Sequence, residues 1–164
     1  MWKGKNVTVF VTGGIAAFKA ATLVRLFVKA GANVEVAMTK SACEFITPLT
    51  FQVLTKNKVH TDTFDEDEAS KVQHIHLADK TDVAVVVPAT ANTIAKMANG
   101  IADNFVTSTL LATMSPIYLA PAMNEHMWEN PATVRNVVQL KADGKVIIEP
   151  ATGFLAEGYN GKGR

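Results

Sequence analysis

The first forty residues hold the pattern that most restricts the fold. A run rich in β-branched and aromatic residues at 6–11 leads into a Thr-Gly-Gly turn at 12–14, and apolar residues then recur at helical spacing over 15–30. Gly31 ends that predicted helix, and residues 33–38 have the character of a second strand. A strand, glycine loop, helix and strand in this order form a βαβ unit, which predicts a parallel sheet with right-handed crossovers.

The rest of the chain continues this alternation. The apolar run 82–87 is unbroken, which is typical of a central parallel strand buried on both faces. We therefore expect one α/β domain over residues 1–164, a doubly wound parallel sheet of about five or six strands, Rossmann-like or flavodoxin-like, with helices on both faces. Its other predicted elements are strands at 117–120 and 146–149 with a short one near Val59, and helices at 42–46, 48–54, 94–98, 105–114 and 130–141.

Two segments stand apart from this pattern. Residues 61–70 include Asp62, Asp65, Glu66, Asp67 and Glu68, and such a run predicts a solvated, mobile loop. The tail 153–164 is rich in glycine, which predicts a loop that becomes ordered only when a ligand binds.

Composition excludes several functional classes. The net charge is +1 and the basic residues are scattered, so the chain lacks the basic stripe of a nucleic-acid-binding surface. Cys43 is the only cysteine, which excludes an internal disulfide and a multi-cysteine zinc site. No apolar stretch is long enough to span a membrane, and the first residues lack the apolar core of a signal peptide. We expect a cytoplasmic protein whose partner is a small molecule or another protein chain.

The loops after the first two predicted strands suit a phosphate. Thr12-Gly13-Gly14-Ile15 opens a helix, where unpaired backbone N–H groups and the helix dipole favour an anion. The second strand is followed by Thr39, Lys40 and Ser41 instead of the acidic residue that a dinucleotide site uses for its ribose. Hydroxyl groups and a cation favour a phosphate, so FMN fits these loops better than NAD. The alternative is that the glycines serve only the turn.

Two more polar segments follow central strands, at the edge where open α/β sheets bind ligands. Residues 88–93 have small side chains that let a flat ring approach the backbone, although capping of a helix would also explain Thr90. Residues 121–128 combine the acceptor and donor of Asn124 with two methionines and a tryptophan, a mixture typical of a pocket. The alternative for this segment is core packing, with the asparagine as a helix cap.

His74 is a candidate general base, because it lies between the acidic segment and a central strand. His76 follows His74 by two residues, but a metal would need further ligands, and neither Cys43 nor His60 or His126 stands at a recognisable spacing, so no metal site is predicted. The alternative for His74 is a structural histidine whose polar atoms are satisfied within the fold.

Together these motifs resemble the flavin-containing cysteine decarboxylases. Three segments carry the resemblance, in the order and spacing of that family: His74-Ile75-x-Leu77-Ala78, Pro88–Lys96 and Pro121–Trp128. It covers nearly the whole chain. Within the family the similarity is strongest to the phosphopantothenoylcysteine decarboxylases of coenzyme A biosynthesis.

The resemblance implies an FMN-binding domain that assembles as a homo-oligomer, a trimer or a dodecamer of trimers, with flavin held at the contact between subunits. It implies that His74 is catalytic, that Asn124 holds the substrate carboxylate and that Met123 lines the substrate pocket. The positions that it implies for contact with FMN are Gly13, Gly14, Ile15, Thr39, Ser41, Thr90, Ala91, Asn92 and Thr93.

The implied reaction converts 4'-phosphopantothenoylcysteine to 4'-phosphopantetheine. Direct loss of CO2 would leave an unstabilised carbanion, so a hydride equivalent first passes from the thiol-bearing carbon to the flavin. The thioaldehyde formed in this way acts as an electron sink during decarboxylation. An ene-thiol remains, and the electrons held by the flavin then reduce it.

One residue departs from the family pattern. The family segment Gly-x-Leu-Ala-Cys-Gly carries a cysteine that donates the proton completing ene-thiol reduction, whereas Gly153–Gly158 has Glu157 at that position. Glu157 can fill this catalytic role only if a closed, apolar site raises its pKa. Two alternatives stay open: the chain is a peptidyl-cysteine oxidative decarboxylase of the lantibiotic type, which stops at the ene-thiol, or Glu157 is a substitution that traps an intermediate.

Two more distant functions share this fold. A flavin prenyltransferase lacks the Pro-x-Met-Asn-x-x-Met-Trp signature, and a non-catalytic flavoprotein regulator has no need of both His74 and Asn124. Members of the family continue beyond the glycine-rich tail, so we expect that a C-terminal segment or a ligase domain is missing from this sequence.

Overall fold

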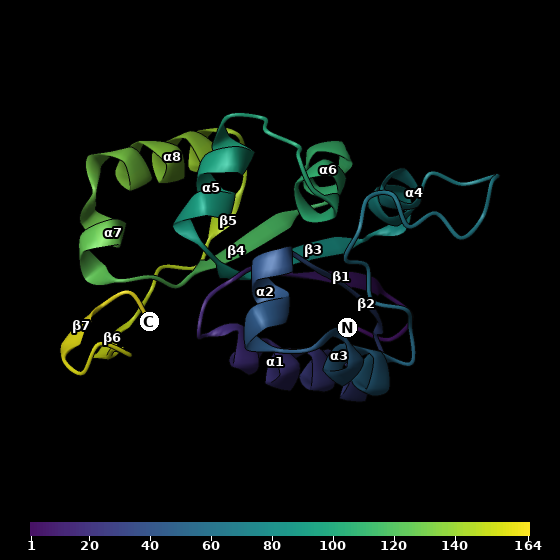
Figure 1. Cartoon of the computed structure of the whole chain (residues 1–164), viewed down its shortest axis with the longest axis horizontal. Coiled ribbons are helices and arrows are strands. Elements are labelled where there is room, and N and C mark those ends of the chain that lie inside the picture. The colour runs from purple at the N-terminus through teal and green to yellow at the C-terminus, as the bar shows by residue number, and fades with distance from the viewer.

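The computed structural model describes residues 1–164 and contains a five-stranded parallel sheet with helices on both faces (Figure 1). The strand order is β2-β1-β3-β4-β5, and every neighbouring pair is parallel. The elements, in chain order, are β1 (Asn6–Val11), α1 (Ala17–Lys29), β2 (Asn33–Met38), α2 (Lys40–Phe45), α3 (Pro48–Thr55), α4 (Gln73–Lys80), β3 (Val83–Ala89), α5 (Ala91–Ala98), α6 (Phe105–Ala112), β4 (Ile117–Pro121), α7 (Glu125–Glu129), α8 (Pro131–Ala142), β5 (Val146–Ile147), β6 (Thr152–Phe154) and β7 (Asn160–Lys162).

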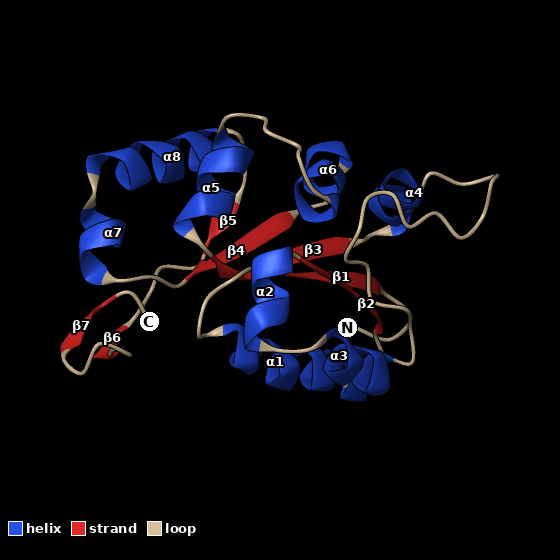
Figure 2. Cartoon of the chain, viewed as in Figure 1, coloured by secondary structure: helices blue, strands red, loops and turns tan.

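Helices α1 and α3 cover one face of the sheet, while α4, α5, α6 and α8 cover the other (Figure 2). The alternation of side chains along each strand fills two separate cores. In β1, Val9 faces the core under α1 and α3, and Phe10 faces the opposite core. In β3, Val85 faces the core under α1 and α3, and Val86 faces the opposite core. The predictions of a doubly wound sheet and of a central strand buried on both faces are therefore confirmed.

The chain reverses its winding beside β1. Helix α1 connects β1 to β2 on one side, and the chain then crosses over β1 through α4 to reach β3 on its other side. The loops after β1 and β3 therefore diverge and leave a crevice between them. Buried Thr12 joins the two loops at the base of this crevice: its Oγ1 donates to the Pro88 carbonyl at 2.5 Å and accepts from the Thr90 N–H at 3.0 Å.

The tail differs from the sequence-based expectation of a loop. Strands β6 and β7 form an antiparallel hairpin, because the glycines supply geometry that other residues cannot adopt. Gly158 has φ of 91° in the turn, and a Cβ on Gly163 would clash with the carbonyl oxygen of Met123. Helix α7 was expected only in the alternative interpretation of Asn124 as a helix cap, and that interpretation is confirmed.

The short strand expected near Val59 is a single bridge at the edge of the sheet. His60 N–H donates to the Val36 carbonyl at 3.0 Å, and Met38 N–H donates to the His60 carbonyl at 2.8 Å. The acidic segment that follows is exposed over residues 64–71, as expected. No helix of the chain is long and apolar enough to cross a lipid bilayer.

Candidate active site

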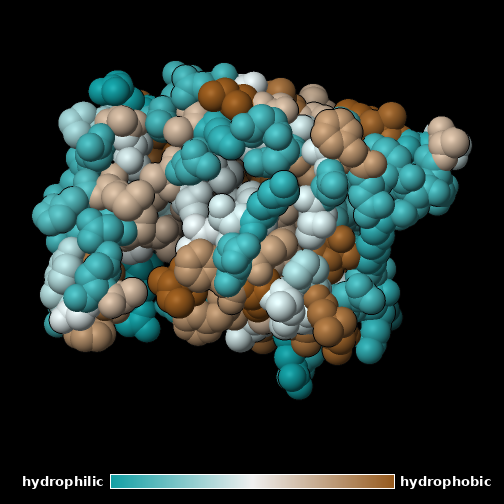
Figure 3. Space-filling model, viewed as in Figure 1, coloured by the Kyte–Doolittle hydropathy of each residue, from teal (hydrophilic) through white to brown (hydrophobic).

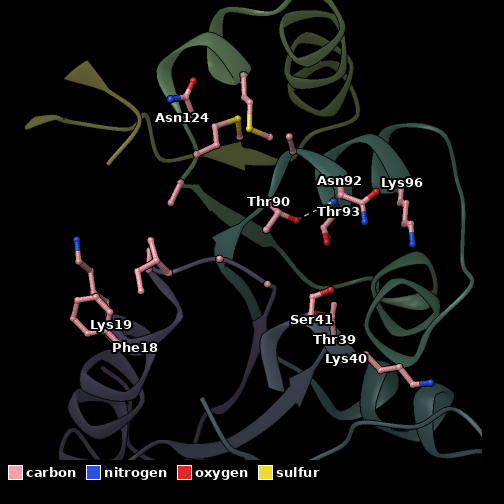
Figure 4. Close-up of a pocket in the computed structure, with 18 of the residues that line it drawn as sticks. Phe18, Lys19, Thr39, Lys40, Ser41, Thr90, Asn92, Thr93, Lys96 and Asn124 are labelled. Carbon is pink, nitrogen blue, oxygen red and sulfur yellow. Dashed lines mark hydrogen bonds between the residues drawn. The ribbon is translucent and has the colours of Figure 1, made fainter. Parts of the chain in front are cut away.

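A pocket of about 1220 Å³ lies at the carboxyl edge of the sheet. Its walls are formed by the loops after β1, β2, β3 and β4, by residues 61–64 and 103–105, and by the C-terminal hairpin (Figure 4). Typical ligand pockets measure roughly 300–1,000 Å³. This one therefore has room for a cofactor and a substrate together.

The predicted site residues converge on this pocket with one exception, His74. The sequence motifs that carry them are far apart in the chain. Glu157 lies in the turn of the antiparallel hairpin, but each of the other motifs follows a different parallel strand, and these strands end at the same edge. The predicted residues that line the pocket are Gly13, Gly14, Ile15, Thr39, Ser41, Thr90, Ala91, Asn92, Thr93, Met123, Asn124 and Glu157.

One end of the pocket has the character of an anion site. The loop before α1 packs directly on the start of α2, since a Cβ on Gly13 would clash with Ser41. No side chain caps α1, and although the Ala17 N–H donates to the Gly14 carbonyl at 2.9 Å, the N–H groups of Gly14 and Ile15 make no hydrogen bond within the chain and remain available to a ligand. Lys19 and Lys40 also line the pocket, and neither lies in an ion pair.

The loop after β3 forms a second wall. Thr90 caps α5, because its Oγ1 accepts from the Thr93 N–H at 3.2 Å (Figure 4). The helix-cap interpretation of Thr90 is therefore confirmed, and Thr90 also lines the pocket. The Asn92 side chain is exposed and makes no hydrogen bond within the chain, which leaves its amide available to a ligand. Lys96 is instead paired with Asp103, at 2.9 and 3.0 Å to the two carboxylate oxygens.

Asn124 also serves two roles at once. Its Oδ1 accepts from the His126 N–H at 2.9 Å and caps α7. Its Nδ2 faces the C-terminal hairpin and donates to Glu157 Oε1 at 2.8 Å and to the Tyr159 hydroxyl oxygen at 3.2 Å. The cap therefore fixes which side of the amide faces the hairpin, since only an oxygen can accept from the backbone N–H.

Glu157 lies in an open environment instead of a closed, apolar one. The hydrogen bond from Asn124 holds the pKa of its carboxyl below the ordinary value, since that bond favours the ionised form. Donation of a proton requires the opposite shift. In this arrangement Glu157 is therefore a hydrogen-bond acceptor and is not prepared to act as an acid.

His74 lies in the first turn of α4, outside the pocket. Its Nδ1 is buried and has no hydrogen-bond partner in the chain. The imidazole ring meets the ring of Phe105 edge to face, at a centroid distance of 6.4 Å. Phe105 lines the pocket, so His74 contacts a residue of the pocket wall without lining the pocket itself. One copy of the chain thus does not bring His74 together with Asn124.

Several lining residues carry little signal in the sequence. Phe18 and Lys19 follow Ile15 by three and four residues, so helical spacing could have placed them on the same side of α1. The segment 61–64 carries no comparable signal, because its position depends on the bridge that His60 makes with β2. The other lining residues not predicted as site residues are Ala16, Lys40, Lys96, Asp103, Asn104, Phe105, Ala122, Met127, Phe154, Leu155, Ala156, Gly163 and Arg164.

A partly buried charge cluster supports the pocket wall from behind. The ring of His60 stacks on Phe105 at 4.9 Å with an interplanar angle of 4°, and His60 Nε2 lies 3.7 Å from Glu35 Oε1. Glu35 also pairs with Lys80 at 2.5 Å. Burial opposes ionisation of Glu35, but the contacts with His60 and Lys80 outweigh it and hold its pKa below the ordinary value. No group of three or more His, Cys, Asp or Glu side chains is placed to hold a metal ion.

Comparison with known proteins identifies the family. The model of the family described as Flavoprotein matches residues 1–164. This chain belongs to the flavoprotein family. It is 54% identical over 164 residues to the Coenzyme A biosynthesis bifunctional protein CoaBC of Bacillus subtilis (strain 168), and the match covers 100% of this chain and 40% of that protein. This flavoprotein chain therefore spans well under half the length of that relative.

Two solved structures resemble this flavoprotein along almost their whole length. The FMN-dependent cysteine decarboxylase SpaF has a TM-score of 0.88 and 34% sequence identity, covering 99% of this chain and 92% of that one. A cysteine-to-serine variant of PPC decarboxylase, complexed with pantothenoylaminoethenethiol, has a TM-score of 0.87 and 32% sequence identity, and the match covers 98% of this chain and 90% of that one. The resemblance to the flavin-containing cysteine decarboxylases is thus confirmed.

Proposed function

We propose that this flavoprotein is an FMN-dependent decarboxylase that converts 4'-phosphopantothenoylcysteine to 4'-phosphopantetheine, and that residues 1–164 form its decarboxylase domain. The observation that carries the proposal is the convergence of two of the three family motifs, Pro88–Lys96 and Pro121–Trp128, with the glycine loop after β1 on one large pocket. The relatives support the choice of substrate, because one is a protein of coenzyme A biosynthesis and another is a PPC decarboxylase.

The pocket residues fit FMN in kind and position. The loop 13–15 and the hydroxyls of Thr39 and Ser41 would hold its phosphate, and the small residues at 90–93 would lie against its ring. Bound FMN would supply a reversible acceptor for the hydride equivalent removed from the thiol-bearing carbon.

The chain's own residues would orient the substrate and close the site. Asn124 would donate through Nδ2 to the substrate carboxylate, and Met123 would supply apolar surface beside it. The hairpin lies against this end of the pocket, since Met123 N–H donates to the Gly163 carbonyl at 2.9 Å and Lys162 N–H donates to Glu125 Oε1 at 3.2 Å. A closed hairpin would keep water from the reacting atoms.

We further propose that the active form is a homo-oligomer, a trimer or a dodecamer of trimers, in which His74 serves the pocket of a neighbouring copy. The exposed apolar residues Val72 and Ile75 flank His74, at 53% and 41% exposure. Other apolar patches interrupt the hydrophilic surface near α1 and α3, where Leu49 and Val53 are more than half exposed (Figure 3). Exposed apolar surface of this kind marks protein contacts.

Hybrid oligomers test the placement of His74. Co-expression of His74→Asn and Asn124→Ala chains, each inactive alone, would give roughly a quarter of the pockets an intact histidine from one chain and an intact asparagine from the other. Recovery of activity near that fraction supports a shared site. If the hybrids are as inactive as their parents, His74 acts within its own chain or not at all.

The main test combines the flavin spectrum with the mass of the product. A purified sample should be yellow, with an absorption band at roughly 450 nm, and 4'-phosphopantothenoylcysteine should yield CO2 and phosphopantetheine. His74→Asn should abolish CO2 release and retain the flavin. A colourless protein that also fails to take up added FMN would refute the flavin site, whereas a yellow protein that leaves the substrate unchanged would refute only the substrate.

Glu157 favours a second candidate, a peptidyl-cysteine oxidative decarboxylase. Such an enzyme needs no proton donor for ene-thiol reduction, and SpaF, a cysteine decarboxylase, is structurally as similar as PPC decarboxylase. Incubation with a peptide that ends in cysteine separates the two functions. Loss of CO2 from the peptide but not from the small substrate, with a product lighter by two hydrogen atoms than the corresponding thiol, supports the second candidate.

A further inference from the structure

The donors of the Asn124 amide are already occupied within the chain. A side-chain amide has two N–H groups, and here one donates to Glu157 Oε1 at 2.8 Å while the other donates to Tyr159 at 3.2 Å. Its oxygen cannot exchange roles with the nitrogen, because it caps α7 through the His126 N–H at 2.9 Å. A carboxylate from outside can therefore bind Nδ2 only by displacing one of these two groups.

Glu157 is a carboxylate like the one that the proposed substrate would present. Its oxygen forms the shorter of the two bonds to Nδ2, and that bond favours its ionised form. Tyr159 offers only a neutral hydroxyl at the longer distance. Charged acceptors bind an N–H group more strongly than neutral ones. A substrate carboxylate that replaced only Tyr159 would lie beside the Glu157 carboxylate on the same nitrogen, where the two negative charges repel, so Glu157 is the group that opposes its binding.

The hairpin holds Glu157 in place through bonds that do not involve its side chain. The Gly163 carbonyl accepts from Met123 N–H, and Lys162 N–H donates to Glu125. Because Glu157 is attached to a docked hairpin, it is present at Asn124 at high effective concentration. A small free carboxylate cannot match this, whereas a ligand that also contacts the rest of the pocket can.

We propose that Glu157 is a specificity-determining residue, a tethered carboxylate that occupies the Asn124 amide and must be displaced by the substrate carboxylate. This inference rests on the proposed function, in which Asn124 holds that carboxylate. Only ligands with further binding contacts displace Glu157. After CO2 leaves, Glu157 returns to Asn124, and the product has no carboxylate with which to displace it again.

The test measures binding to the flavin-loaded protein with two unreactive probes. Both are analogues in which a hydroxyl replaces the thiol: phosphopantothenoylserine, which has the carboxylate, and its decarboxylated counterpart, which does not. Calorimetric titration of wild type and Glu157→Ala with each probe gives four dissociation constants. Tyr159→Phe is the matched control, because it removes the other partner of Asn124 without removing a charge.

Glu157→Ala should tighten binding of the carboxylate probe about three- to tenfold and leave the decarboxylated probe within about twofold. Tyr159→Phe frees the other N–H group but leaves the charge of Glu157 in place, so it should change the ratio of the two constants less than about twofold. If Glu157→Ala changes both probes equally, or neither, the competition is refuted while binding by the wild type still supports the proposed substrate. If the wild type binds neither probe but retains its flavin spectrum, the proposed substrate is wrong and the competition is refuted with it.

Discussion

The contact between Gly13 and Ser41 provides the most direct test of how the pocket is built. Replacement of Gly13 by alanine would place a Cβ 2.9 Å from the carbonyl carbon of Ser41 and 3.1 Å from its Cα, and closer still to its Cβ. The first two atoms belong to the backbone at the start of α2, so no side-chain rotation can relieve the clash. The loop before α1 must move away from α2 instead.

Overpacking of this kind costs about 1–3 kcal/mol in the free energy of unfolding. For a chain of this length, 1 kcal/mol lowers Tm by roughly 2–4 °C, so Gly13→Ala should lower Tm by roughly 2–12 °C. The same movement separates the backbone N–H groups of the loop from Thr39 and Ser41, so the affinity for FMN should also fall. Urea unfolding and fluorescence titration with FMN measure the two effects.

Gly14→Ala is the matched control. Its Cβ would meet only Thr90 Cγ2, at 3.9 Å, which is an ordinary van der Waals contact. The free energy of unfolding should therefore stay within about 0.5 kcal/mol of wild type. If Gly13→Ala is as stable as Gly14→Ala and binds FMN as tightly as wild type, the close contact between the two loops does not shape the site, and the reasoning is refuted.

Three further predictions concern polar groups. Thr12→Val removes the buried hydroxyl that joins the loops after β1 and β3, and the cost, about 2–3 kcal/mol by urea unfolding, should largely disappear in Thr12→Ser. Asn124→Ala should raise the pKa of Glu157 toward its ordinary 4.5, measured by NMR titration, and an unchanged value would show that another group sets it. The folded-state pKa of Glu35 lies below 4.5, so its contribution to stability is present above pH 4.5 and is lost as the pH falls through the folded value. Glu35→Gln should therefore be less stable at neutral pH and should lose less stability on acidification, and an unchanged slope in acid would contradict this.

The fold could be predicted because its signals are local. The run of β-branched and aromatic residues in β1 and the unbroken apolar run in β3 each identify a strand within a few residues, and the order of elements then leaves few topologies. The place of the site followed from the same order, since parallel strands present the loops 13–15, 39–41 and 90–93 at one edge.

The features that could not be predicted depend on contacts between distant segments. Glu157 sits against Asn124, thirty-three residues away in the sequence, and this contact sets the direction of its pKa shift. His74 lies close in sequence to β3, yet the turn of α4 directs it to Phe105 instead of the pocket. The glycines of the tail indicated flexibility, whereas their backbone angles and close contacts produce a hairpin.

Asn124 and Thr90 show why the helix-cap and binding-site interpretations of the sequence did not exclude each other. Each residue caps its helix with one oxygen, Oδ1 of Asn124 or Oγ1 of Thr90. A second polar group of each residue then bonds to a different part of the pocket wall: Nδ2 of Asn124 donates to the hairpin, and the N–H of Thr90 donates to Thr12. The cap therefore does more than end a helix, because it fixes the rotamer of a side chain that lines the pocket. A group held in this way loses little further entropy when a ligand arrives. In this sheet, capping of the helices and preparation of the site are consequences of the same hydrogen bonds.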